Sequence, residues 1–107
     1  MSKPSAPRTS KPARLTAAKV KLAAEIREQL AAQGGAAHRE VVIGRILQRK
    51  GVHGPAAERT RRALLSAFEL HAHAEPGSEV PRLFDLPFGP DSYRWALDEP
   101  VRAAIPF

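Results

Sequence analysis

A short break bounded by two glycines constrains the fold of this chain more than any other feature. Gly51 follows Arg49 and Lys50, and basic residues in a last turn before glycine commonly end a helix. Gly54 precedes Pro55, which suits the first turn of a new helix because the N–H that proline lacks would have no partner there. The sequence therefore predicts two helices joined by a sharp turn.

Apolar residues recur at helical spacing on both sides of this break. At about 100° per residue, each helix gathers its apolar side chains on one side. These are Val42, Ile43, Ile46 and Leu47 in the first helix, and Ala57, Leu64, Leu65, Phe68 and Ala72 in the second. Residues 38–73 thus have the outline of a helix-turn-helix, the motif that lays its second helix in a groove of DNA.

The side of the second helix that faces away from its apolar residues is polar. Arg59, Arg62 and Ser66 fall together there. A guanidinium group can bind phosphate or guanine with two parallel hydrogen bonds, so this face suits DNA. The alternative is an ordinary solvated face on which Glu58 and Glu69 are local charge partners.

Three further basic residues near the break are candidates for DNA contact. Arg61 lies close to the apolar side of its helix, so its long side chain either extends to solvent or reaches a partner. Arg49 and Lys50, at the end of the preceding helix, are predicted to hold phosphates.

Positive charge is concentrated in the front half of the chain. The net charge is +6, and residues 76–107 contain three basic against five acidic residues. A cationic front half predicts an anionic partner, because binding releases the counterions of that partner. Residues 1–14 contain only basic charges, which are Lys3, Arg8, Lys11 and Arg14.

Residues 1–14 are also rich in proline and serine and have little to bury, so a disordered arm is expected. Such an arm could follow a DNA backbone or enter a minor groove. The alternative is a terminus that only adds solubility.

A helix is predicted from Leu15 to Gln33, with Thr16 as its cap. Its core side consists of Leu22, Ile26 and Leu30. A second side of small residues is either mildly apolar surface or the interface of a homodimer, which would suit DNA with two half-sites. This side consists of Ala17, Val20, Ala24 and Ala31.

Beyond Gly77 the apolar period changes from helical to alternating. Two alternating runs surround a turn-rich segment at residues 87–92, which predicts a β-hairpin. The runs are Phe84, Leu86 and Phe88, then Tyr93, Trp95 and Leu97. We expect their aromatic rings in the core, which argues against RNA binding by base stacking.

The predicted fold is mainly α, with a three-helix helix-turn-helix core and a small C-terminal β-hairpin. By this order of elements, residues 15–99 resemble the winged helix-turn-helix superfamily of DNA-binding proteins. Asp91 departs from the resemblance, since wing tips of the superfamily often offer Arg or Lys, and only Arg82 and Arg94 flank this one. The hairpin then either covers the helices or binds a protein, and residues 100–107 form a tail that packs back or contacts a partner.

Several classes of protein find no support in the sequence. There is no cysteine, no glycine-rich phosphate loop and no nucleophile elbow, so we expect no enzyme, cofactor or metal site. The four histidines are scattered at His38, His53, His71 and His73. No apolar run approaches the roughly 20 residues that span a bilayer, and the start lacks a secretory signal. A cytoplasmic protein is expected, nucleoid-associated if bacterial.

The sequence thus predicts a small DNA-binding protein, either a transcriptional regulator or a chromosome-associated factor, that reads duplex DNA with the helix at 55–73. The alternative is a protein-interaction module, such as an inhibitor, an antitoxin-like factor or an assembly subunit, that uses residues 80–107. The predicted DNA-binding residues are Arg59, Arg61, Arg62, Ser66, Arg49, Lys50, Lys3, Arg8, Lys11 and Arg14.

Overall fold

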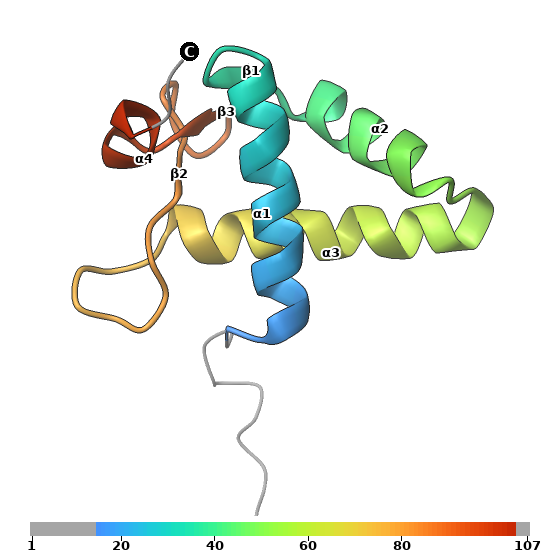
Figure 1. Ribbon diagram of the computed structural model, residues 1–107, viewed down its shortest axis with the longest axis horizontal. Helices are drawn as coiled ribbons and strands as arrows, with labels where there is room; N and C mark the ends of the chain where they lie inside the picture. The colour runs from blue at the N-terminus through green and yellow to red at the C-terminus, as the bar shows by residue number, and fades with distance from the viewer. Residues whose placement is uncertain (1–14, 105–107) are drawn as a thin grey trace, which may run out of the picture.

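The computed structural model describes residues 15–104, which form four helices and three short strands (Figure 1). In chain order these are α1 (Ala17–Ala32), β1 (Ala36–His38), α2 (Arg39–Lys50), α3 (Gly54–Ala72), β2 (Phe84–Asp85), β3 (Arg94–Leu97) and α4 (Glu99–Ala103). The expectation of a mainly helical protein with a small β component is confirmed.

Helix α1 begins and ends at the residues that the sequence marks. The Thr16 hydroxyl accepts a hydrogen bond from the Lys19 N–H at 3.2 Å, as predicted for its cap. Gly34 and Gly35 follow the helix with φ angles of 85° and 106°, a region that glycine adopts without steric cost. These two glycines turn the chain from α1 directly into β1.

The glycine-bounded turn between α2 and α3 is also confirmed. Gly51 adopts the left-handed conformation, with φ 68°, and its N–H donates to the Leu47 carbonyl at 3.0 Å. Helix α3 starts at Gly54, with Pro55 in its first turn. Only residues 51–53 separate the two helices, which meet at a tight corner (Figure 1).

The sheet contains one strand more than the predicted hairpin. Strands β2 and β3 pair antiparallel with Phe84 opposite Leu97, and β1 pairs with the other edge of β3, with Ala37 opposite Trp95. The strand order is β1-β3-β2. Strand β1 has no β-branched or aromatic residue before its final histidine, so its pairing with β3 and not its local composition makes it a strand.

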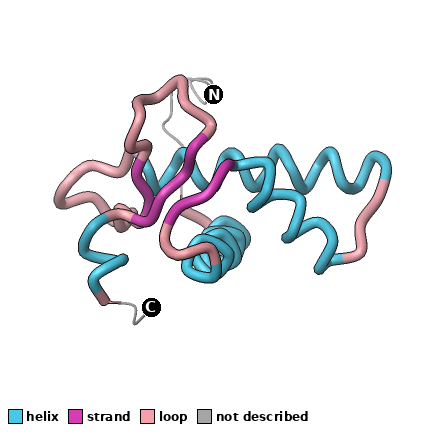
Figure 2. The backbone as a smooth tube through the Cα atoms, turned by 90° about the horizontal axis from the view of Figure 1, so that it is seen from above, coloured by secondary structure: helices cyan, strands magenta, loops and turns pink. Residues whose placement is uncertain are grey.

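Three aromatic rings join the sheet to α3. The Phe68 ring stacks on Trp95 with centroids 3.9 Å apart and on Phe84 with centroids 5.0 Å apart. The sheet therefore lies at the C-terminal part of α3, at the opposite end of that helix from the α2–α3 turn (Figures 1 and 2). The surrounding core consists of Ala23, Ile26, Leu30, Ala37, Val42, Ile43, Ile46, Leu64, Ala72 and Leu97.

Two of the aromatic residues expected in the core are exposed instead. Phe88 is 74% exposed and Tyr93 is 53% exposed, whereas Phe84 and Trp95 are buried. The expectation was wrong because β2 ends at Asp85 and β3 begins only at Arg94, so Phe88 and Tyr93 lie on the loop between the strands.

Candidate nucleic-acid interface

The polar side of α3 faces solvent. Arg59, Arg62 and Ser66 are all exposed, whereas Leu64 and Phe68 of the same helix are buried. The helical period that placed Arg59, Arg62 and Ser66 together in the sequence therefore places them together on the surface. We call these three residues the α3 face.

The two arginines of the α3 face have little competition from carboxylates. No carboxylate oxygen in residues 15–104 lies within 4.0 Å of the Arg59 guanidinium. Arg62 Nη1 lies 3.9 Å from Glu58 Oε1 one turn earlier, and both side chains are about two-thirds exposed. An exposed pair this long contributes at most a few tenths of a kcal/mol, so Arg62 is available to a ligand.

Arg61, in contrast, is engaged inside the domain. Its two terminal nitrogens donate to the two carboxylate oxygens of Glu40 at 2.6 and 2.5 Å, and its side chain is 28% exposed. These hydrogen bonds lower the pKa of Glu40 and raise the pKa of Arg61, so both groups stay charged. Arg61 therefore reaches a partner on α2 and clamps α2 to α3, which makes it a weaker candidate for DNA contact.

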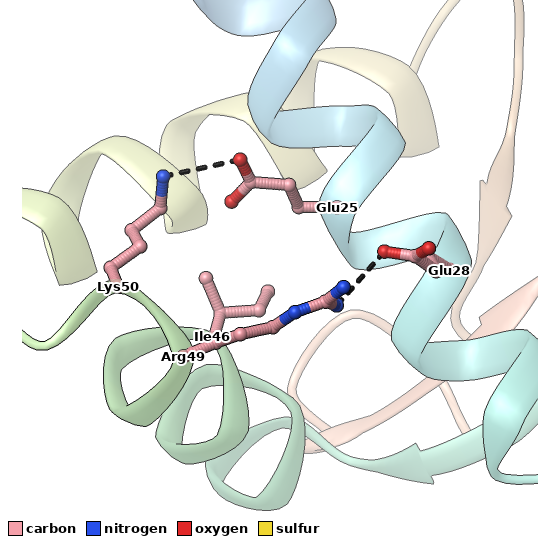
Figure 3. A pocket seen from close by; sticks show the side chains of 5 residues that line it. All are labelled: Glu25, Glu28, Ile46, Arg49 and Lys50. Atoms are coloured by element: carbon pink, nitrogen blue, oxygen red, sulfur yellow. Dashed lines mark hydrogen bonds and ion pairs between the residues drawn. The ribbon is translucent and has the colours of Figure 1, made fainter.

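Arg49 and Lys50 are also paired, on the other side of α2. Arg49 Nη1 lies 3.0 Å from Glu28 Oε1, and Lys50 Nζ lies 3.1 Å from Glu25 Oε2 (Figure 3). Together with Ile46 these four side chains line an open hollow of about 290 Å³ between α1 and α2. We call these five residues the α1–α2 seam.

The opposite charges of the α1–α2 seam neutralise each other. Arg49 and Lys50 therefore link α2 to α1, and a phosphate would have to compete with the carboxylates for them. Local sequence carries no signal for these pairs, because the partners are 21 and 25 residues apart and meet only when α1 packs on α2. Arg49 keeps a 61% exposed side chain, whereas that of Lys50 is 29% exposed.

The four basic residues of the predicted arm, Lys3, Arg8, Lys11 and Arg14, lie outside the described residues. Residues 15–104 contain thirteen basic and eleven acidic side chains, so +4 of the net charge of +6 belongs to residues 1–14. The folded part of the chain is close to electrical balance. Which of its cations are free therefore matters more than how many there are.

Two arginines near the sheet were not singled out from the sequence as contact residues. The Arg39 guanidinium lies over the Tyr93 ring, 4.0 Å from its centroid, and 3.6 Å from the Glu40 carboxylate. Arg94 is exposed, with no carboxylate oxygen of the described residues within 4.0 Å. Only the pairing of β1 with β3 brings Arg39 to Tyr93, so local sequence carried no signal for this contact.

Other kinds of site find no basis in the described part of the chain. No three histidine or acidic side chains there gather as metal ligands would. None of its helices combines the length and the apolar character that crossing a membrane requires.

Comparison with known proteins gives no match to a family model, to a curated protein or to a solved structure. A functional assignment therefore depends on the geometry and charge of the residues of this chain.

Proposed function

We propose that this chain binds duplex DNA by inserting α3 into the major groove, as a small regulator or chromosome-associated factor. The observation that carries the proposal is the α3 face. Arg59 and Arg62 project to solvent from the helix that follows the glycine turn. Within residues 15–104, Arg59 has no carboxylate within 4.0 Å, and Arg62 has the long, exposed pair with Glu58. Arginine forks at such positions suit the O6 and N7 acceptors of guanine.

The arrangement of elements supports the same proposal. A three-residue turn joins α2 to α3, which is the length that helix-turn-helix motifs use. Three helices followed by an antiparallel hairpin is also the order of the winged helix-turn-helix proteins, and β1 adds a third strand to that hairpin. A winged-helix-like domain is thus the fold that we propose for residues 15–99.

Charge supports it as well. Residues 1–14 bring four cations and no anion, so they can hold phosphates while α3 contacts bases. Ser66 adds a hydroxyl that can donate to a phosphate or a base edge.

Fluorescence anisotropy of the full chain with duplex DNA, across a salt series, tests the proposal. We expect affinity to fall as salt rises, and Arg59→Glu with Arg62→Glu to weaken binding by about 100-fold, because two base or phosphate contacts are lost and two repulsions added. The matched control is Arg49→Gln with Lys50→Gln, for which we expect a change within about threefold, since both cations are already paired with α1.

Neutralising Lys3 and Lys11 in the same assay should flatten the slope of log affinity against log salt by about 2. An absence of binding at low salt, or an affinity that salt does not change, would rule out the proposal. Equal losses in the α3-face variant and the seam variant would exclude the assignment to α3.

A further inference from the structure

The loop between β2 and β3 is held in one conformation by two successive β-turns. The Gly89 N–H donates to the Leu86 carbonyl at 3.0 Å, and the Ser92 N–H donates to the Gly89 carbonyl at 3.1 Å. Pro87 and Pro90 occupy the second position of these turns, where the fixed φ of proline fits. Because the loop is already ordered, a ligand that binds it loses little conformational entropy.

This rigid loop displays a phenylalanine to solvent. Phe88 is the third residue of the first turn, and at 74% it is the most exposed large apolar side chain of the described residues. A single exposed apolar side chain is common on protein surfaces. Phe88, however, lies in a turn that a backbone hydrogen bond closes, and it shares its loop with a second exposed aromatic residue, Tyr93.

Tyr93, at the other end of the loop, is held by backbone and side-chain contacts from residues 38 and 39. Its carbonyl accepts a hydrogen bond from the Arg39 N–H at 2.7 Å, and the Arg39 guanidinium covers its ring. The edge of the His38 ring lies nearby, with centroids 5.8 Å apart. The exposed Tyr93 ring therefore has a guanidinium over its face, and Arg94 is the next residue in the chain.

The loop lies beside the proposed DNA-binding helix. Pro90 and Ser92 line a small hollow together with Glu69 of α3 and with His73, which directly follows that helix. Seen from above, the loop projects past α3 on the side opposite α1 (Figure 2). The α3 face also points away from the core that α1 covers. A nucleic acid bound to α3 would therefore extend past this loop.

We propose that Phe88 and Tyr93 stack on unpaired bases that adjoin the duplex bound by α3. Exposed aromatic rings next to arginines are the means by which proteins hold single-stranded nucleic acid, because every base has a π-face. The proposal rests on the proposed function and specifies its substrate as DNA with a paired and an unpaired part, such as an overhang, a fork or a bulge.

The charge at the tip of the loop favours bases over the phosphate backbone. Asp91 sits between the two aromatic residues in sequence and forms no ion pair within residues 15–104, so the tip of the loop repels phosphate. The same residue is the departure from the cationic wing tip of the winged helix-turn-helix superfamily. A loop whose tip disfavours phosphate and whose rings are exposed is suited to bases that have left the helix.

Three fluorescent probes test this inference on the full chain: a blunt duplex, the same duplex with a short unpaired overhang, and the overhang strand alone. We expect the overhang to tighten binding by about tenfold, the typical gain from stacking one base on an aromatic side chain. A 2-aminopurine placed in the overhang should lose fluorescence on binding, because stacking quenches it.

Phe88→Ala and Tyr93→Ala should remove this preference and leave affinity for the blunt duplex unchanged. The matched control is Val41→Ala, which truncates another exposed apolar side chain, 42% exposed and on α2. That variant should keep both the preference and the quenching.

Duplex binding through Arg59 and Arg62 without any overhang preference would overturn this inference and leave the proposed function standing. Binding of the overhang strand that needs Phe88, with no binding of the blunt duplex, would overturn the proposed function and the paired part of the substrate, and would leave the stacking of Phe88 on unpaired bases. An equal loss on the blunt duplex and on the duplex with the overhang in Phe88→Ala would assign the ring to contacts with paired DNA and contradict the inference. Unchanged binding in both loop variants would overturn it and point to a protein partner for the loop, and no binding of any probe would overturn both proposals.

Discussion

The α3 face and the α1–α2 seam both carry basic side chains, but those of the seam are paired with carboxylates and those of the α3 face are largely free of them. At the seam, Arg49 and Lys50 each have a carboxylate of α1 at about 3 Å. On the α3 face, Arg59 has none among the described residues and Arg62 has one at 3.9 Å. The first pair of cations joins two helices, and the second pair is left for a ligand.

The difference shows why net charge alone is a poor guide to a polyanion site. Residues 15–104 hold only two more basic than acidic groups, so most of their positive charge is cancelled within the fold. A guanidinium group that is already bound must lose its carboxylate before it can gain a phosphate, and the two energies largely offset each other. The property to test is therefore whether a cation is free of a carboxylate partner.

Freeing the seam cations should turn the seam into a DNA contact. Glu25→Gln with Glu28→Gln removes both carboxylate partners, and we expect duplex affinity at low salt to rise by about five- to tenfold, since two more cations can release counterions. The matched control is Glu79→Gln with Glu99→Gln, which changes net charge equally at two exposed sites elsewhere. Anisotropy measures both, and equal gains would show that total charge and not availability governs binding.

The neighbours Arg61 and Arg62 should separate stability from binding. Arg61→Ala removes two hydrogen bonds to Glu40 and should lower the free energy of unfolding by about 1 kcal/mol, with little loss of DNA affinity. Arg62→Ala should leave stability within about 0.5 kcal/mol and weaken binding by several-fold. Urea denaturation and anisotropy on both variants check this, and a larger binding loss in Arg61→Ala would contradict the comparison.

Acid should weaken the Arg61–Glu40 clamp slightly. The hydrogen bonds from Arg61 lower the pKa of Glu40 below the ordinary glutamate value of about 4.3. The clamp therefore contributes its full stability above about pH 4.3 and loses it as pH falls through the lower pKa of the folded state. This change in stability with pH should be the smallest of the three predicted effects, because the Glu40 side chain is 47% exposed and solvent screens its charge.

Thermal unfolding of the wild type and of Glu40→Gln over a range of acidic pH measures this contribution. The difference between the two proteins should be largest near neutral pH and shrink on acidification. A difference that stays constant down to about pH 3 would exclude a charged clamp.

Much of the fold follows from local sequence. The cap at Thr16, the glycine turn and the helical periods fix α1, α2 and α3 because each signal acts within one or two turns. Strand β1 could not be predicted. Ala36 and Ala37 have no strand preference, and they pair with β3, which lies about 60 residues later in the sequence.

The α3 face could also be predicted, because helical period alone decides which residues share a side. Which cations stay free could not, since Arg49 and Arg61 find carboxylates 21 residues away. Phe88 differs from its predicted place for another reason. It alternates with Phe84 as strand residues do, but Pro87 and Pro90 turn the chain out of the sheet after Asp85.

The stacked rings at the junction of sheet and α3 also give the protein an internal optical reporter. Trp95 is the single tryptophan of the sequence and is almost fully buried. Its ring centroid lies 3.9 Å from that of Phe68. It is therefore shielded from anything that touches the surface of α3. A change in its emission when a ligand is added would mean that the strands had shifted against the helix, whereas constant emission would mean that the domain binds as a rigid body.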